Sequence, residues 1–425
     1  MEKLVMRVYR DVLRTPGVLN VTASQLFARL PLGMLNLAIL MHVQSKTGSY
    51  ALAGAAVACV SIGEALAMPV TARIAGRAMV ITLIAAALTN GIAMLALAFA
   101  GASGPLLLML GVLIGASVPP LMPVVRALYP QLVPSDGVRA LFAFDTTAQE
   151  LIWVVGPVAT TFLASALSTA IPLAVSAGVT VVGTTWFLLG ARHLRPPTGM
   201  AASAFGRVIA NRAVILAMVA SLALVASFMA LEVGIVAALG RTGVTAGLAI
   251  AVASVGSLVG GLMFGHRRFR LAGLVAALGI VAAGTAVFGL VGNLALQFCA
   301  LFVSGLGFAP AMSALYLMVS REIEEHSAAE AFGWLNSAAL VGGASGTALA
   351  GVAADAHGAH GAVVVSAVLA TLAAGSPVVA RMAGPLRGLG DQPDAPTPQG
   401  GHGPDPACSG EDLECACPGQ VTRSR

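Results

Sequence analysis

Charged residues are scarce in this chain of 425 residues. Aspartate, glutamate, lysine and arginine together make up 10% of the sequence, whereas a soluble domain contains about 25%. Hydrophobic residues make up 58%, and the mean hydropathy is +0.90. This balance excludes an ordinary soluble domain, and we expect a polytopic, all-α integral membrane protein that lies in a lipid bilayer.

Lysine and aromatic residues are scarce as well. Lys3 and Lys46 are the only lysines among 23 basic residues, and aromatic residues make up 5% of the chain. The net charge of +5 lies between apolar runs, where cations orient membrane spans, so we expect no nucleic-acid partner. The preference for arginine is typical of GC-rich bacterial genomes, and the predicted location is the inner (plasma) membrane of a bacterial cell.

Cysteines are few and form no disulfide framework. Cys59 and Cys299 fall in apolar runs, and the last three, beginning at Cys408, have a C-x6-C-x-C spacing that matches no standard zinc site. The chain also lacks a phosphate-binding loop, a nucleophile–base arrangement and a nucleotide-binding domain. We therefore expect neither an enzyme nor an ATP-driven pump, and no metal or other cofactor.

Long apolar runs dominate what is present, and about 20 such residues are enough to cross a bilayer as a helix. The predicted spans are residues 20–42, 50–72, 78–100, 105–128, 138–164, 170–191, 213–239, 246–264, 271–291, 294–319, 331–353 and 361–381. A longer polar connection separates the first six from the last six. The sequence therefore predicts twelve transmembrane helices in two six-helix halves.

Composition divides the chain into five parts. These are a cytoplasmic amphipathic segment (1–16), an N-terminal six-helix bundle (17–191), a central cytoplasmic loop (192–212), a C-terminal six-helix bundle (213–383) and a disordered cytoplasmic tail (384–425). The tail is rich in proline, glycine and aspartate and has almost no apolar residues. Similar residues recur at one constant offset along the chain, as in Gly115 and Gly305 or Pro120 and Pro310, which indicates a duplication.

Basic residues in the connecting segments predict the orientation. The segments predicted to lie inside carry Lys3, Arg7, Arg10, Arg14, Arg73, Arg77, Arg126, Arg139, Arg192, Arg195, Arg207, Arg212, Arg267, Arg268, Arg270, Arg321, Arg381 and Arg387. The outside segments carry only Lys46 and Arg241. Because cytoplasmic loops are enriched in lysine and arginine, both termini should lie inside.

Cysteine labelling tests this topology. A single cysteine replacing Ser103 or Asn293 should react with a membrane-impermeant maleimide on intact cells, because both positions fall in predicted outside loops. A cysteine at Gly199 or Ser409 should react only after permeabilisation. Labelling of Gly199→Cys on intact cells would rule out the twelve-span arrangement.

Three short patterns resemble a known family. A basic loop follows the second span, ARIAGR (Ala72–Arg77), and another follows the eighth, GHRRFR (Gly265–Arg270). The fifth span contains the pair Gly156-Pro157. With six plus six spans, these patterns resemble the major facilitator superfamily, and the Gly-Pro pair resembles its drug-efflux members. The resemblance covers about residues 1–385 and implies that superfamily's fold, with both termini inside, and secondary transport.

The sequence departs from the superfamily's patterns at three places. Gly76 stands where the loop motif has an acidic residue, Ile152 where the Gly-Pro motif has a glycine, and Gly111 where the fourth span has an arginine. Proton-driven drug antiporters carry this arginine in the fourth span, and its absence here is a difference from them. Arg29 is a candidate to take its place. The strings PPLMPVVRALYPQL and AFDTTAQELIWVVGP look like a group of largely uncharacterised actinobacterial permeases.

Arg29 is a single charge within the first predicted span. A cation at membrane depth costs about 2.5–3.5 kcal/mol on insertion scales, so it needs a polar surrounding and an acidic partner. Pro31 should bend the helix there. Glu64 in the second span lies at a similar depth and is the best candidate partner by position. The alternative is that Arg29 reaches the cytoplasmic interface and only anchors the helix.

Carboxylates at membrane depth are candidates for proton transfer, because burial favours the protonated form of a carboxyl group. Together with Arg29 and Trp153, we expect Glu64, Glu150 and Glu232 to line a substrate or coupling cavity. The alternative is that the carboxylates only fix the bundle. Trp153 is either a cavity wall or an interfacial ring.

A second group is predicted to form the cytoplasmic gating and loop motif. Its members are Arg73, Arg77, Arg126, Asp145, Arg267 and Arg268. Asp145 lies close to the inner surface, where Arg126 could meet it. Outside, Asp355 and its two histidine neighbours are expected to lie in a solvated loop.

Small residues at helical spacing predict close helix packing. They occur around Gly156-Pro157 in the fifth span and at Gly342 and Gly346 in the eleventh. We expect these two spans to pack across the interface between the halves.

These features predict a secondary active transporter of a small organic solute that works by alternating access as a monomer. Proton-coupled efflux is the first interpretation, with protons as the second partner. The alternatives are an uptake carrier or uncoupled facilitator, and a membrane sensor or scaffold that transports nothing. Solute, direction and stoichiometry do not follow from the sequence.

Overall fold

The computed structural model describes residues 15, 17–133, 135–194, 211–240, 244–264, 271–322 and 325–382. Within these ranges the secondary structure is helical, with no strand. Most of the predicted amphipathic segment 1–16, most of the central loop 192–212 and the predicted tail 384–425 lie outside the described residues. The boundaries predicted for the two bundles stay predictions.

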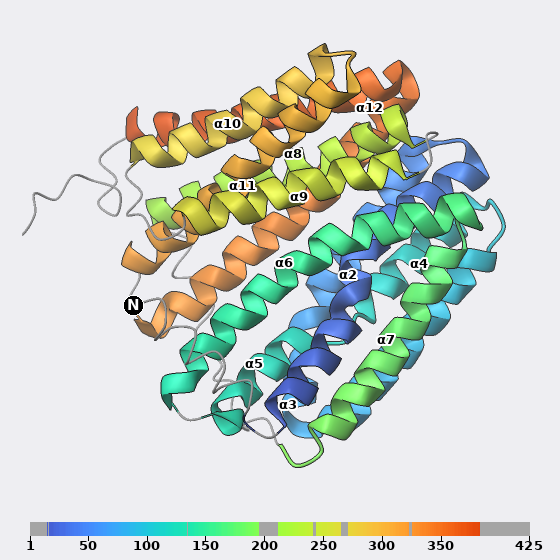
Figure 1. Ribbon diagram of the computed structural model, residues 1–425, viewed down its shortest axis with the longest axis vertical. Helices are drawn as coiled ribbons and strands as arrows, with labels where there is room; N and C mark the ends of the chain where they lie inside the picture. The colour runs from blue at the N-terminus through green and yellow to red at the C-terminus, as the bar shows by residue number, and fades with distance from the viewer. Residues whose placement is uncertain are drawn as a thin grey trace, which may run out of the picture. The chain divides into compact units, whose positions relative to one another are not determined.

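The helices form two sets along the chain (Figure 1). The N-terminal set is α2 (Val18–Thr47), α3 (Tyr50–Phe99), α4 (Gly104–Ala116), α5 (Leu121–Leu132), α6 (Ser135–Ala166) and α7 (Ile171–Gly190). The C-terminal set is α8 (Arg212–Leu239), α9 (Thr245–Phe264), α10 (Leu271–Leu290), α11 (Leu294–Glu322) and α12 (Glu325–Met382).

Two of these helices each contain a pair of predicted spans. The backbone of α3 leaves the helical region at Ala78, where the third span was expected to start. In α12 it does so at Gly358, whose φ of 66° lies in the left-handed region that glycine adopts without a steric cost. The predicted division of both segments into two spans is therefore visible as a break in each helix.

The fourth predicted span, 105–128, corresponds to the candidate span Gly104–Arg126, but its helix is interrupted. The chain leaves the helix after Ala116 and resumes at Leu121, so α4 and α5 share this span. Pro119 and Pro120 lie in the break, and proline supplies no backbone N–H to the helix.

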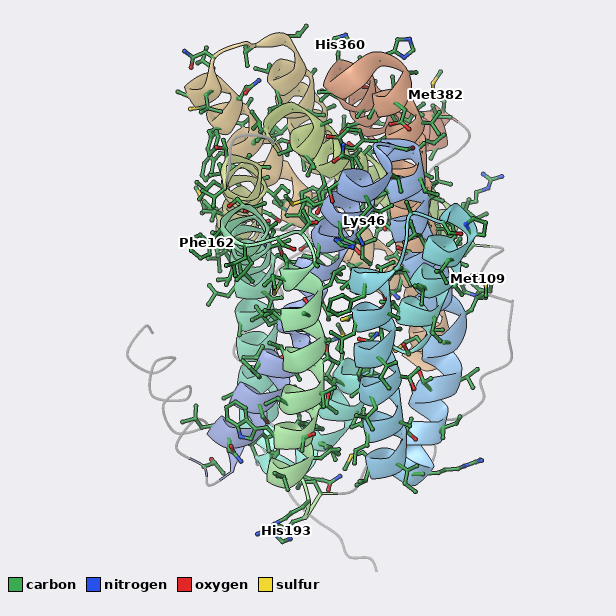
Figure 2. The ribbon with its side chains drawn as sticks, turned by 90° about the vertical axis from the view of Figure 1, so that its right-hand side faces the viewer. Lys46, Met109, Phe162, His193, His360 and Met382 are labelled. Atoms are coloured by element: carbon green, nitrogen blue, oxygen red, sulfur yellow. The ribbon has the colours of Figure 1, made fainter. Side chains whose placement is uncertain are left out.

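Ten helical segments of the described chain are long and apolar enough to cross a membrane. One of them, Gly333–Met382, contains the break at Gly358, and a shorter apolar segment, Leu151–Ala166, lies in α6. Large apolar side chains such as Met109 and Phe162 are exposed, which suits contact with lipid (Figure 2). The count of twelve and the inside location of the termini stay predictions.

Within each set, helices cross at glycines that occupy equivalent positions of the expected repeat. A Cβ atom at Gly115 would overlap the carbonyl oxygen of Val60, and one at Gly305 would overlap that of Ala253. The two glycines stand at the repeat offset seen in the sequence, and their partners Val60 and Ala253 stand at nearly the same offset. The next pair of crossings is related in the same way, so the helices of the two sets pack alike.

That next pair corrects one expectation from the sequence. Gly156 meets Gly33 of α2, and Gly346 meets Ala226 of α8, while Gly342 meets Leu222 of α8. All three glycines therefore pack within their own set. The expectation that they bring the fifth and eleventh spans together across the interface was wrong. The faces of α6 and α12 that carry these glycines pack on α2 and α8, the first helix of each set.

Other glycines make the contacts between the sets. Gly54 of α3 lies against the carbonyl oxygen of Thr347 in α12, and Gly247 of α9 lies against that of Pro157 in α6. These two crossings are also equivalent in the repeat. Only a glycine fits here, because any Cβ would overlap backbone. The fifth and eleventh spans do reach the interface, but their partners are α9 and α3.

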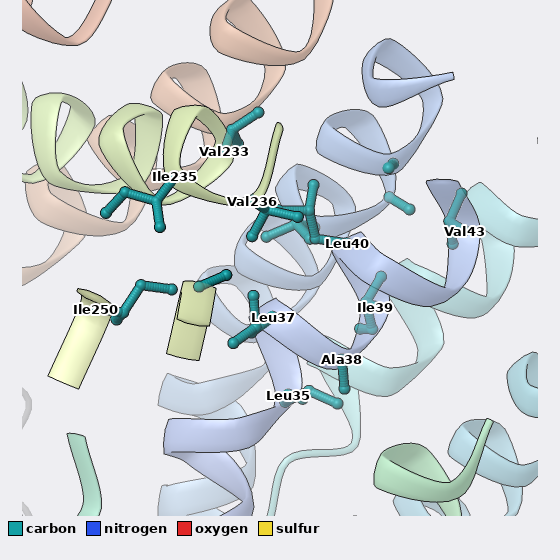
Figure 3. Close-up of a cluster of buried hydrophobic side chains, with 14 of the residues drawn as sticks. Leu35, Leu37, Ala38, Ile39, Leu40, Val43, Val233, Ile235, Val236 and Ile250 are labelled. Atoms are coloured by element: carbon teal, nitrogen blue, oxygen red, sulfur yellow. The ribbon is translucent and has the colours of Figure 1, made fainter. Parts of the chain in front are cut away.

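Buried apolar side chains form three clusters that differ at the two ends of the helices. One cluster, which we call the shared core, contains residues of both sets, such as Leu37 and Leu40 of α2 and Val236 of α8 (Figure 3). The other two each belong to one set, around Tyr129 and around Leu315. The sets are thus joined by apolar packing at one end.

The shared core marks the end where α2 and α8 finish and α3 and α9 begin. Lys46, labelled in Figure 2, lies at this end and donates a hydrogen bond to the carbonyl oxygen of Ala100 at 2.8 Å. The predicted topology places this end outside. His193, at the end of the N-terminal set, lies at the opposite end in Figure 2.

Candidate functional site

Four polar side chains from α2 and α6 form a buried cluster, which we call the Arg29 cluster. Gln25 and Arg29 lie one helical turn apart on α2, and Asp145 and Gln149 lie one turn apart on α6. Arg29 is 2% exposed and Asp145 0%. At about 1.5 Å per residue, Arg29 lies roughly 16 Å from the start of α2, well within the span.

The guanidinium of Arg29 makes three hydrogen bonds in this cluster. Nη1 donates to Oδ1 of Asp145 at 2.9 Å and to Oε1 of Gln25 at 2.8 Å. Nη2 donates to Oε1 of Gln149. Gln25 in turn donates from Nε2 to Oδ1 of Asp145 at 2.8 Å. Buried ions are tolerated when they are paired and hydrogen-bonded in this way.

Helix α5 adds a second cation to the cluster. Nε of Arg126 lies 3.8 Å from Oδ2 of Asp145, and the side chain of Arg126 is 39% exposed. The expected meeting of Arg126 and Asp145 is therefore present. Buried Tyr129 of α5 also lies beside Asp145. One carboxylate thus faces two guanidinium groups and connects α2, α5 and α6.

The predicted pairing of Arg29 with Glu64 was wrong, since Arg29 pairs with Asp145. Glu64 lies on the face of α3 that crosses α4, where its backbone nitrogen is 2.9 Å from the Cβ position of Gly115. Similar depth suggested this pair, but depth along a helix does not determine which face of the helix a side chain occupies. The alternative of Arg29 reaching an interface is also wrong, because its side chain is buried.

Glu232 lies in the C-terminal part of α8, at the shared-core end, beside a small apolar pocket. The pocket of about 10 Å³ is lined by Phe228, Leu231, Glu232, Ile235, Ile250 and Ala253, and this volume is about the minimum for one water molecule. Among the described residues, neither Glu232 nor Glu64 has a hydrogen-bond or ion-pair partner. Each is half-buried.

The other predicted site residues are distributed more widely. Trp153 is half-buried on α6, and Arg77 is exposed on α3. The side chains of Arg73 and Glu150, and residues Arg267 and Arg268, lie outside what the structure describes. No group of three or more histidine, cysteine, aspartate or glutamate side chains in the described ranges could hold a metal ion.

Sequence reasoning missed Gln25 and Gln149. Both lie four residues from a charge, Gln25 before Arg29 and Gln149 after Asp145, so each shares a helix face with it. Two such pairs in neighbouring membrane spans are a signal that could have identified the cluster. An uncharged amide is a less obvious partner for an arginine than a carboxylate is.

The fold and this cluster define a class: a helical membrane protein whose two similar helix sets meet at one end, with a buried ion pair inside the N-terminal set. The sequence model of the Major Facilitator Superfamily matches residues 21–347. The chain belongs to this superfamily, whose members are transporters rather than enzymes. No curated protein sequence matches the chain.

Solved structures share the fold. A mutant form of the nucleoside transporter NupG superposes with a TM-score of 0.67 and 13% identity, over 86% of this chain and 98% of that one. A bacterial homologue of the human lysosomal transporter Spinster, in an inward-facing and occupied conformation, gives 0.66 and 13%, over 86% and 96%. At this identity the likeness concerns the fold alone.

Proposed function

We propose that this secondary transporter exports a small organic solute across a bacterial plasma membrane in exchange for protons. The observation that carries the proposal is the unequal packing at the two ends. At one end both sets share an apolar core, and at the other each set has its own. Such packing lets the two sets separate at one end while they stay joined at the other.

The crossings between the sets favour alternating access. Gly54 against Thr347 and Gly247 against Pro157 are equivalent in the repeat, and at each a glycine lies against a carbonyl oxygen of the other set; the hydroxyl of Thr161 also lies against Gly247. Smooth backbone contacts of this kind allow one set to tilt against the other without repacking large side chains. A solute bound between the sets would then meet each side of the membrane in turn.

Proton coupling rests on Glu232. Its carboxyl group borders an apolar pocket and has no partner among the described residues. The Arg29 cluster is different, because Asp145 there is held by Arg29 and Gln25. We assign the proton to Glu232 and a positioning role to the Arg29 cluster. Each proton that enters gains about 2.3 kcal/mol per 100 mV of membrane potential, which can drive export.

Replacement of Glu232 tests this assignment. Glu232→Gln mimics the protonated carboxyl at nearly constant volume, so the two sets can still exchange solute. We expect counterflow to persist in proteoliposomes while accumulation driven by a pH gradient is lost. Ile235→Leu, in the wall of the same pocket, is the matched control and should keep both activities. Glu64→Gln tests the other carboxyl group without a partner in the described ranges.

Two outcomes would change the assignment. Full gradient-driven accumulation by Glu232→Gln excludes Glu232 as the proton carrier. If Glu64→Gln shows the loss instead, the carrier is on α3. If both variants accumulate solute like the parent, the uncoupled facilitator becomes the better interpretation.

A further inference from the structure

Asp355 makes a polar contact between the two sets that sequence reasoning did not expect. Its Oδ2 accepts hydrogen bonds from Ser49 Oγ at 2.6 Å and from Ala51 N at 2.9 Å, and its Oδ1 accepts one from Tyr50 N at 2.6 Å. Asp355 is exposed, as expected, but it lies in a helix rather than a loop and has hydrogen-bond partners. Asp355 lies in α12, and its three donors form the start of α3.

Asp355 of α12 caps the N-terminus of a different helix, α3. The first N–H groups of a helix have no partner within the helix, and the helix dipole favours a negative charge there. Ser49 already caps α3, since its Oγ accepts from Leu52 N at 3.1 Å. Asp355 satisfies two further N–H groups from the other set. A carboxylate is suited to this place, because hydrogen bonds to a charged acceptor are stronger than neutral ones.

The backbones of α3 and α12 are in direct contact beside Asp355. One turn before Asp355, Gly351 lies against the carbonyl oxygen of Tyr50, and Gly54 lies against that of Thr347. The hydrogen bonds of Asp355 therefore exist only while α3 and α12 are in contact at this end. If the sets separate there by more than about 1 Å, all three bonds are lost together.

The repeat shows that this contact is specific to one side of the interface. The sequence offset that relates Thr347 to Pro157 also relates Asp355 to Ser165 of α6. Ser165 donates a hydrogen bond to the carbonyl oxygen of Phe162 in its own helix. The crossing of α6 and α9 thus has a neutral serine at the position where the crossing of α12 and α3 has a carboxylate.

We propose that Asp355 is a gating residue: it caps α3 only in the state that is closed at the shared-core end, and thereby sets how often that end opens. This inference rests on the proposed alternating access. With the predicted topology, the contact keeps the outer side closed. Loss of the carboxylate should raise the population that is open outside by about tenfold, as expected when charge-assisted hydrogen bonds are lost.

Solvent access at the shared core measures this population without a known solute. In a chain whose five native cysteines are replaced by serine, Leu40→Cys places a reporter in the shared core, where Leu40 is 2% exposed. We expect Asp355→Asn to raise the rate of labelling by an impermeant maleimide from outside about tenfold. Ser165→Ala, at the equivalent position, is the matched control and should leave the rate unchanged.

A cross-link provides a second measurement if Asp355→Asn folds poorly. Ser49→Cys with Asp355→Cys, without the reporter, should form a disulfide on oxidation, because the two side chains touch. The oxidised protein should not exchange solute, and a reductant should restore the exchange. An unchanged labelling rate in folded Asp355→Asn, or solute exchange by the oxidised protein, would overturn the proposal. Changed labelling without any transported solute would instead reject the proposed function alone.

Discussion

Arg29→Ala is expected to abolish transport and to destabilise the folded protein by about 3–5 kcal/mol. The substitution removes three hydrogen bonds and leaves Asp145, which is 0% exposed, without its closest cation. Arg126 cannot compensate fully, because its Nε lies 3.8 Å from the carboxylate and its side chain is partly exposed. The thermal midpoint in detergent and counterflow in proteoliposomes measure the two effects.

A double substitution separates lost charge balance from lost packing. In Arg29→Ala with Asp145→Asn the unpaired charge is gone, so the loss of stability should be smaller than the sum of the two single losses. Arg29→Lys keeps the charge but not the fork that reaches Asp145 and Gln149 together, and should lose part of the stability. If Arg29→Ala exchanges solute at the parent's rate, the positioning role of the cluster is refuted.

Gly54→Val should trap the protein open at the shared-core end. The new side chain would overlap the backbone of α12 at Thr347, which is a contact between the sets. Overpacking costs about 1–3 kcal/mol. If that strain exists only in the closed state, it shifts the equilibrium towards the open state by about 5–150-fold. Labelling of Leu40→Cys from outside should rise accordingly, and solute exchange should fall.

Gly63→Val on the same helix is the matched control. Gly63 also lies against a backbone carbonyl, that of Val112, but this partner is in α4 and belongs to the same set. The strain should then be present in both states, lowering the thermal midpoint without changing access from outside. Equal effects of Gly54→Val and Gly63→Val on labelling would show that the crossing of α3 and α12 does not distinguish the states.

The class of fold was predictable because span length and loop charge depend on the bilayer and little on neighbours. The repeat at Gly115 and Gly305 was also predictable, because a position where two backbones touch requires glycine, and glycine can be read in the sequence. Which helix each glycine contacts was not predictable. Gly156 packs on Gly33 within its own set, and no property of the span containing it distinguishes that helix from one across the interface.

The partner of Arg29 shows the same limit at the site. Depth suggested Glu64, but the arginine pairs with Asp145, which was placed nearer the surface. Choosing correctly requires knowing that α2 packs on α6 through the face of Gln25 and Arg29. Asp355 was missed for another reason: two of its donors are backbone N–H groups of α3, and backbone groups carry no residue-specific signal.

Solute flux in proteoliposomes tests proton-coupled transport most directly. The purified parent chain would be assayed by counterflow against a panel that includes nucleosides, organic cations and organic anions, with the lumen more acidic than, equal to or more alkaline than the bath. We predict that at least one solute exchanges, that it accumulates when the lumen is more acidic, and that a protonophore abolishes this accumulation. Exchange that ignores both the pH gradient and the protonophore would contradict proton coupling.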